Sequence, residues 1–230
     1  MSQKRKLGKV EGILILRSIF FMAFITAITF ILAGRLDYWQ GWTYIGLNII
    51  FLLLSYFLLP PELIQERLKP KEGMKTWDKT FYIVSEPVFF AVLIISVLDG
   101  GRFGWGPRIP IFVIIIAALV YSIGQIIVLW AKRENKFFSS VVRVQKDRGQ
   151  TVCKCGPYQF VRHPGYLGGL LYSVATPLLL GSFWGLIPTL ISLILLFIRT
   201  YLEDKTLLEE LKGYKDYTEE VRYRILPGIW

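Results

Sequence analysis

Residues 109–131 read IPIFVIIIAALVYSIGQIIVLWA and contain no charged side chain. A helix needs roughly 20 apolar residues to cross the ~30 Å of hydrocarbon in a bilayer. Three more stretches meet this requirement, at residues 13–34, 42–60 and 81–98. Apolar blocks of this length exclude a water-soluble globule and a disordered chain, and they indicate an integral, multi-pass membrane protein.

Two further apolar stretches, residues 166–180 and 183–201, are separated only by Gly181-Ser182. The first is short and rich in glycine, so we expect it to be tilted or partly embedded. The sequence therefore predicts an all-α fold, a polytopic bundle of about six (five to six) transmembrane helices whose last two form a tight hairpin. The first stretch is longer than the ~7–15 apolar residues of a secretory signal, and we expect it to persist as an uncleaved span.

The net charge of +10 is unevenly distributed along the chain. If the N-terminus is cytoplasmic, 23 Lys and Arg residues fall on the cytoplasmic side of the expected spans and 3 on the other. Cytoplasmic loops of membrane proteins carry this excess of basic residues, so we predict that both termini are cytoplasmic. Topology and anionic lipid account for the positive charge, and we expect no nucleic-acid partner.

The two cysteines and the single histidine are too few for a four-ligand zinc site, and we expect no metal. Cys153 and Cys155 lie two residues apart in a basic segment, which is typical of reduced thiols rather than a structural disulfide.

The longest polar segment, residues 132–164, connects the fourth and fifth stretches on the predicted cytoplasmic side. A connection of this length suggests function. We divide the chain into a four-helix transmembrane region, 1–131, and a region 132–230 made of this cytoplasmic loop, the helical hairpin and a C-terminal tail expected to form an interfacial helix. Pro164 suits the first turn of a helix, whose free N–H groups favour a carboxylate or another polar ligand. His163, just before it, is either a structural hydrogen-bonding residue or a ligand contact.

Two further polar features lie at or within apolar stretches. Arg199 and Glu203 are four residues apart, hence on one face of a helix, at the end of the last stretch. They form either an intrahelical salt bridge or part of a site, and Arg before Glu is the less favourable order for the salt bridge. Glu86 lies inside the third stretch, where a carboxylate is either a functional residue or one that reaches a nearby interface.

The C-terminal motifs occur in a recognisable order. They are Gly156-Pro-Tyr158, Val161-Arg-His-Pro-Gly-Tyr166, Arg199-x-x-x-Glu203-Asp204 and Gly213-Tyr214. This order resembles the isoprenylcysteine carboxyl methyltransferase family, part of a broad group of membrane methyltransferases that includes phospholipid N-methyltransferases. The resemblance covers about residues 145–230.

The resemblance implies S-adenosyl-L-methionine as methyl donor, and a lipid or lipidated small molecule in the bilayer as acceptor. Arg199 would hold the acceptor's carboxylate, and Glu203 would face the cofactor, with Leu202 and Asp204 as lesser candidates for that position. The implied reaction is carboxyl O-methylation of an isoprenylcysteine-like substrate; a phospholipid or amine N-methylation is the alternative. The residues expected to enclose the cofactor are Gln145, Gln150, Thr151, Val152, Cys153, Tyr158, His163, Pro164, Gly165 and Tyr166.

Two other classes of protein compete with a methyltransferase. NADPH-dependent sterol reductases have a similar hairpin, but their pattern favours Asn after the proline, where this chain has Gly165. A transporter or other non-catalytic membrane protein would more often show internal repeats and polar groups at mid-membrane, whereas the polar clusters here lie at one face. The sequence leaves open whether the acceptor is a carboxylate, an amine or a thiol, and it does not indicate the oligomeric state.

Overall fold

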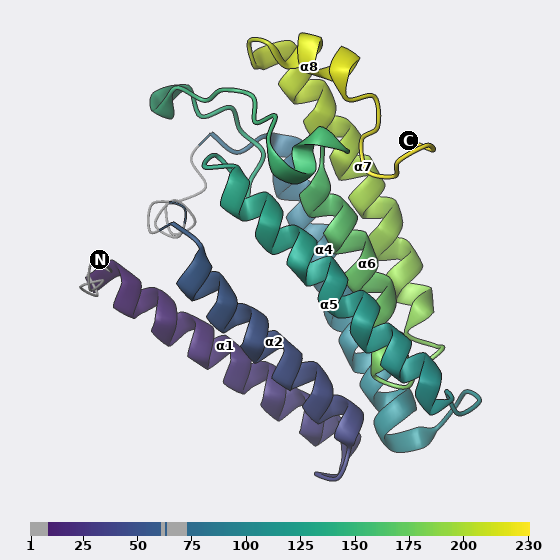
Figure 1. Cartoon of the computed structure of the whole chain (residues 1–230). Coiled ribbons are helices and arrows are strands. Elements are labelled where there is room, and N and C mark those ends of the chain that lie inside the picture. The colour runs from purple at the N-terminus through teal and green to yellow at the C-terminus, as the bar shows by residue number, and fades with distance from the viewer. Residues whose placement is uncertain (1–8, 61–62, 64–72) are drawn as a thin grey trace.

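The computed structural model of the chain describes residues 9–60, 63 and 73–230, and all regular structure within them is helical. The helices are α1 (Lys9–Ala33), α2 (Trp39–Leu58), α4 (Thr76–Val97), α5 (Ile111–Glu134), α6 (Pro164–Leu179), α7 (Leu186–Glu210) and α8 (Tyr214–Glu220). In Figure 1, α1 and α2 form an antiparallel pair beside the larger group of α4 to α7. The predicted all-α, polytopic bundle is confirmed.

Five helices in the described part of the chain are long and apolar enough to cross a membrane. They are α1, α2, α4 together with the π-helical turn η1 (Leu98–Phe103), α5 and α7. The remaining hairpin helix, α6, has 16 residues. At 1.5 Å per residue it is about 24 Å long, which is short of the ~30 Å hydrocarbon core. It packs against α5 and α7. The described residues therefore contain five candidate spans and this shorter helix.

Two of the helices, α4 and α7, extend by at least five residues beyond their apolar stretches. α4 begins at Thr76, five residues before the apolar stretch at 81, and α7 continues to Glu210, nine residues beyond position 201. The added turns are polar because they extend past the expected hydrocarbon boundary. They carry Asp78 on α4 and Glu203 and Asp204 on α7, so these side chains are fixed on rigid helices rather than on loops.

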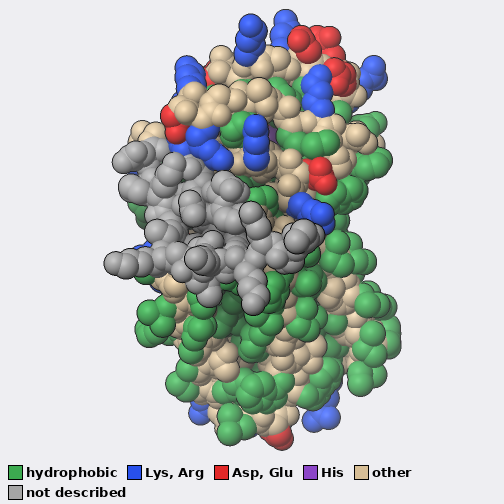
Figure 2. Space-filling view, turned by 60° about the vertical axis from the view of Figure 1, so that its left-hand side comes forward, with side chains coloured by type: hydrophobic (Ala, Val, Ile, Leu, Met, Phe, Trp, Pro, Cys, Tyr) green, Lys and Arg blue, Asp and Glu red, His purple; other side chains and the backbone are tan. Residues whose placement is uncertain are grey.

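Charged side chains gather at one end of the molecule. Figure 2 shows Lys, Arg, Asp and Glu crowded over the end that carries the 135–163 segment and α8, a broad apolar belt below it, and few charges at the opposite end. We call these the polar end and the far end; η1 lies at the far end. The expected cytoplasmic residues Lys4, Arg5, Lys6, Arg67, Lys69 and Lys71 lie outside the described residues, and the orientation across the membrane stays a prediction.

The backbones of α5 and α6 touch at a pair of glycines. A Cβ atom built on Gly168 would lie 2.4 Å from the carbonyl oxygen of Gly124, and one built on Gly124 would lie 2.6 Å from the oxygen of Gly168. Small residues allow membrane helices to approach this closely, and van der Waals packing then holds them. This contact fixes α6, and with it the residues just before its first turn.

We expect Gly168→Ala to lower the thermal unfolding temperature, because the new methyl group forces apart two backbones that are already in contact. Overpacking of this kind costs about 1–3 kcal/mol. Gly46→Ala is the matched control, since nothing lies within 4 Å of its added Cβ. Thermal melts of the purified proteins in one detergent check this, and equal unfolding temperatures for the two variants would contradict the packing described here.

Candidate functional site

A cavity of about 520 Å³ opens at the polar end. Its walls come from α4, the end of α5, residues 135–153, Tyr158, the first ten residues of α6, α7 from Ser192 onward, and α8. This volume lies within the ~300–1,000 Å³ of small-molecule sites. The expected site residues that line it are Gln150, Thr151, Val152, Cys153, Tyr158, His163, Gly165, Tyr166, Arg199 and Glu203.

The segment before α6 is held by the C-terminal tail. The N–H groups of Arg162 and His163 donate to the carbonyl oxygens of Tyr223 and Arg224, at 2.9 and 2.8 Å. α6 then begins at Pro164, in the first turn as expected, and no side chain caps this end. The positive end of the α6 dipole therefore lies at the cavity wall, next to Gly165, and suits a negatively charged group.

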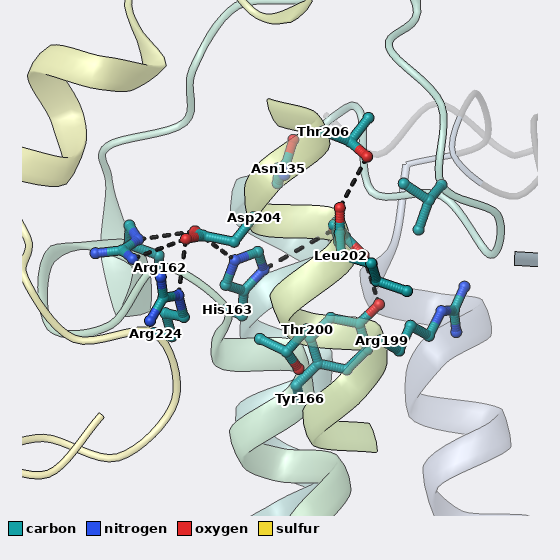
Figure 3. A network of polar contacts seen from close by, with 12 residues as sticks. Asn135, Arg162, His163, Tyr166, Arg199, Thr200, Leu202, Asp204, Thr206 and Arg224 are labelled. Atoms are coloured by element: carbon teal, nitrogen blue, oxygen red, sulfur yellow. Dashed lines mark hydrogen bonds and ion pairs between the residues drawn. The ribbon is translucent and has the colours of Figure 1, made fainter. Parts of the chain in front are cut away.

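A buried carboxylate, Asp204, connects this segment to α7 and to the tail. It is 1% exposed and accepts hydrogen bonds from Arg162 at 2.9 Å to each oxygen, from Arg224 at 2.8 Å and from Tyr214 at 2.8 Å. His163 Nε2 lies 3.1 Å from the same group. Figure 3 shows Arg162, His163 and Arg224 converging on Asp204.

The environment of Arg162 keeps it charged. Burial by itself lowers the pKa of its guanidinium, but the hydrogen bonds and negative charge of Asp204 outweigh burial and raise the pKa overall. Arg162 Nη1 also donates to the carbonyls of Val221 and Arg222, at 2.9 and 2.7 Å. This arginine is therefore a structural tie between the loop, α7 and the tail.

We expect Asp204→Asn to destabilise the polar end strongly, because two arginines lose their buried counter-charge. Breaking a buried pair in this way costs about 3–5 kcal/mol. Limited proteolysis of the C-terminal tail and thermal melts measure the effect, and Asp216→Asn, at an exposed position on α8, is the control. If tail cleavage and melting match those of the control, Asp204 does not hold the tail.

Arg199 faces the other side of the site, toward α4 (Figure 3). Its guanidinium carbon lies 4.6 Å from the ring centre of Phe81 and 5.1 Å from that of Tyr82, and Nη2 donates to the carbonyl of Ser140 at 2.8 Å. Stacking on aromatic faces and hydrogen bonding orient an arginine while leaving its charge available. Within the described part of the chain Nη1 donates no hydrogen bond, which leaves this nitrogen for a ligand in the cavity.

Asp78, on α4, holds the Arg199 guanidinium in position by an ion pair. Its carboxylate is fully buried, with Oδ2 accepting the N–H of Val142 at 2.8 Å and Oδ1 lying 3.0 Å from Arg199 Nε. The Nε–H is not aligned on that oxygen, so the contact is an ion pair rather than a hydrogen bond. Asp78 thus joins α4, the 135–153 segment and α7 at one point.

Glu203 lies one turn beyond Arg199 on α7 and lines the same cavity. It accepts a hydrogen bond from the hydroxyl of Tyr166, and its Oε1 lies 3.9 Å from Nδ1 of His163. Arg199 and Glu203 do not form the salt bridge weighed as the alternative; each has its own partners. The two neighbours considered for the Glu203 position, Leu202 and Asp204, do not line the cavity.

Tyr158 lines the cavity where its ring packs with Tyr214 and Tyr217 of α8. Burial raises the pKa of its hydroxyl well above the ordinary value, so this group stays protonated. The side-chain amide of Asn135 donates to it at 3.3 Å, and Tyr217 donates to the Tyr158 carbonyl at 2.6 Å. The wall is therefore polar but uncharged at this point.

Two expected cofactor residues are in the region but not on the cavity. Gln145 is 1% exposed; its side chain donates to the carbonyl of Phe137 at 2.8 Å, and its backbone N–H donates to Gln150 at 2.6 Å. It shapes the segment that carries Gln150, Thr151 and Val152. Pro164 is buried in the first turn of α6 and does not line the cavity.

Sequence analysis missed Asp78, Asn135 and Ser140, all of which line the cavity or hold residues that do. Asp78 was missed because an Asp in the first turn of a helix is ordinarily explained by the helix dipole. The signal that could have found it is its position just before the aromatic pair Phe81-Tyr82, since a carboxylate next to aromatic residues at a span boundary suggests a buried cationic partner.

The comparison with known families agrees with this geometry. Residues 112–213 match the profile of the phospholipid methyltransferase family. No curated protein matches the chain. The match runs from α5 through the cavity segment to the end of α7, and it confirms the resemblance drawn from the motifs for this part of the chain. With five candidate spans among its described residues, the chain is an integral membrane protein, and its residues 112–213 are similar to the phospholipid methyltransferase family.

Proposed function

We propose that this protein transfers the methyl group of S-adenosyl-L-methionine to a lipidic acceptor at the cytoplasmic membrane boundary. The observation that carries the proposal is that Arg199 and Glu203, one turn apart on α7, face one cavity together with His163, Gly165 and Tyr166. The strong excess of basic residues on this side supports the cytoplasmic assignment. The family match favours methyl transfer over the reductase alternative.

The residues around the part of the cavity nearest the polar end fit the methyl donor. Glu203 and the hydroxyl of Tyr166 offer a carboxylate and a polar group, the N-terminus of α6 offers positive potential for the donor's carboxylate, and Tyr158 offers an aromatic face. When bound, S-adenosyl-L-methionine supplies an electrophilic methyl group on a positively charged sulfur. A carboxylate such as Glu203 stabilises a cation at this place.

The part of the cavity that extends toward the apolar belt, which we call the lower cavity, fits an acceptor that arrives from the bilayer. It continues between α4, α6 and α7 to Glu86, Ser173 and Ser192. Ser192 lies seven residues before Arg199, which is about 10 Å along the helix toward the apolar belt. An apolar chain can therefore extend into the membrane while its polar head stays next to Arg199.

Arg199 would act as the clamp for an acceptor carboxylate, as in an isoprenylcysteine-like lipid. A guanidinium held by Asp78, Ser140 and two aromatic rings has little freedom left, so it fixes the bound oxygen in place. A carboxylate acceptor is already deprotonated at neutral pH, so no general base is required. Placement of the reacting atoms in line is then the main contribution of the protein.

We expect two variants to separate the two parts of the cavity. Arg199→Ala should lower methylation of an S-prenylcysteine by about 100-fold, equivalent to ~2.7 kcal/mol, and leave the affinity for S-adenosylhomocysteine within about twofold. Glu203→Gln should instead weaken that affinity by about tenfold. Calorimetry and a labelled-methyl assay measure both effects.

The matched controls are Arg133→Ala and Glu209→Gln, at exposed positions outside the cavity. Both should retain binding and turnover. Equal loss of donor binding in the Arg199 and Glu203 variants would overturn this division of roles.

A second candidate function is N-methylation of an amine-bearing lipid, and the position of Glu86 favours it. This carboxylate lines the lower cavity one turn from Tyr82, the residue whose ring contacts Arg199. Within the described residues Glu86 forms no ion pair and no side-chain hydrogen bond. A carboxylate in a membrane span is costly unless it meets a cation or a polar cavity, and a lipid amine would satisfy it.

With phosphatidylethanolamine as acceptor, we expect Glu86→Gln to reduce transfer by about tenfold, because the amine loses a charge-assisted contact worth ~1.5 kcal/mol. Transfer to an S-prenylcysteine should not change. Glu219→Gln, exposed on α8, is the control. Absence of transfer to the amine lipid by the unaltered protein would remove this second function.

A further inference from the structure

The two cysteines of the chain lie in contact on the edge of the cavity. Cys153 Sγ and Cys155 Sγ are 3.4 Å apart, and they lie 3.7 and 4.0 Å from the same carbonyl oxygen, that of Glu134 at the end of α5. Cys153 is partly buried and lines the cavity, whereas Cys155 is exposed and does not line it.

We propose that Cys153 and Cys155 are a reversible oxidation site, and that a disulfide between them withdraws Cys153 from the cavity wall and weakens donor binding. The formation of the disulfide stands on the sulfur geometry alone. Its effect on donor binding rests on the proposed function.

The surroundings determine which sulfur moves. A disulfide is about 2.05 Å long, so the sulfurs must approach by roughly 1.4 Å. Cys155 is followed by Gly156, whose backbone packs closely against α5: an added Cβ would lie 2.5 Å from Glu134 Cγ and 2.9 Å from Trp130 Nε1, so the backbone on this side has little room to shift. We therefore expect the backbone movement to fall on Cys153 and on Thr151 and Val152 before it, and these are the residues that line the cavity.

The residue between the cysteines points away from the cavity, since Lys154 Nζ donates to Glu220 Oε1 of α8 at 2.6 Å at the surface. A disulfide between cysteines separated by one residue closes a small ring, which forms only with strain. Strained disulfides have higher reduction potentials and are readily reduced, which is characteristic of regulatory rather than structural bonds.

The chemistry assigns a different role to each sulfur. Burial raises the pKa of Cys153 to about 12, so at neutral pH it is a thiol, and the exposed Cys155 is the sulfur that meets an oxidant. With hydrogen peroxide, the Cys155 thiolate attacks one oxygen, the O–O bond breaks, and the products are a sulfenic acid and, after protonation, water. The Cys153 sulfur then bonds to Cys155 Sγ, and the hydroxyl group leaves with the thiol proton as a second water.

The experiment uses the full chain, which has only these two cysteines. The reduced, purified protein is treated with hydrogen peroxide, and one portion is then reduced again with dithiothreitol. Intact mass and non-reducing gels report a disulfide within one chain, as the loss of two hydrogen atoms without a dimer band. Calorimetry with S-adenosylhomocysteine reports the state of the cavity.

We expect peroxide to form the intrachain disulfide and to weaken S-adenosylhomocysteine binding by about tenfold, with full recovery after reduction. Cys155→Ser should bind as the reduced protein does and should not respond to peroxide. Cys153→Ser should form no intrachain disulfide, and its Cys155 should pass to sulfinic acid. Together these variants distinguish a disulfide effect from general oxidation.

Oxidation of Cys155 to sulfinic acid in the unaltered protein, without a disulfide, would overturn the proposal. So would a disulfide that leaves the affinity unchanged. If the reduced protein does not bind S-adenosylhomocysteine at all, the proposed function fails, while the mass measurement still decides whether the oxidation site exists.

Discussion

The charge balance around Asp204 is the interaction on which the polar end depends. One carboxylate, 1% exposed, receives two arginines, a tyrosine and the ring of His163 from three separate parts of the chain. Each arginine would be costly to bury alone, and the pair is stable because both guanidinium groups share one carboxylate through well-formed hydrogen bonds. The tail, the segment before α6 and the end of α7 are therefore one unit. The orientation of the His163 ring and of the first turn of α6 follows from that unit.

A second buried carboxylate, Asp78, has the corresponding role on the opposite wall. Asp204 fixes the loop side of the cavity, and Asp78 fixes Arg199 from the α4 side. Both carboxylates are buried among arginine partners, whereas Glu203 and Glu86 line the cavity. The carboxylates that hold the structure together are therefore distinct from those that can contact a ligand, although all four lie on α4 or α7. This separation is what allows one cavity to offer an anionic and a cationic contact at the same time.

Much of the architecture could be predicted from the sequence, because a bilayer leaves few alternatives. The apolar stretches, the short glycine-rich α6 and the shared face of Arg199 and Glu203 follow from residue spacing alone. The helix ends were predicted less well: α7 continues nine residues past position 201, since hydropathy marks the hydrocarbon boundary and not the end of hydrogen bonding. The pairing of Asp78 with Arg199 could not be read from the sequence, because 121 positions separate these residues and only the packing of α4 on α7 brings them together. Gln145 was expected to contact the cofactor, but its side chain is buried in the loop. A family motif does not indicate whether a side chain points at a ligand or into the loop that carries it.

The far end of the bundle is closely packed, whereas the polar end carries the open cavity. The hydroxyl of Ser182 donates to Asp99 at 2.6 Å, that of Tyr38 donates to the carbonyl of Leu180, and Leu179 and Leu180 are completely shielded from solvent. These contacts join η1, the turn after α6 and the start of α2 into one packed unit at the far end. Because the cavity opens at the polar end, a methyl transfer of the kind proposed would take up its reactants and release its products on that side of the membrane.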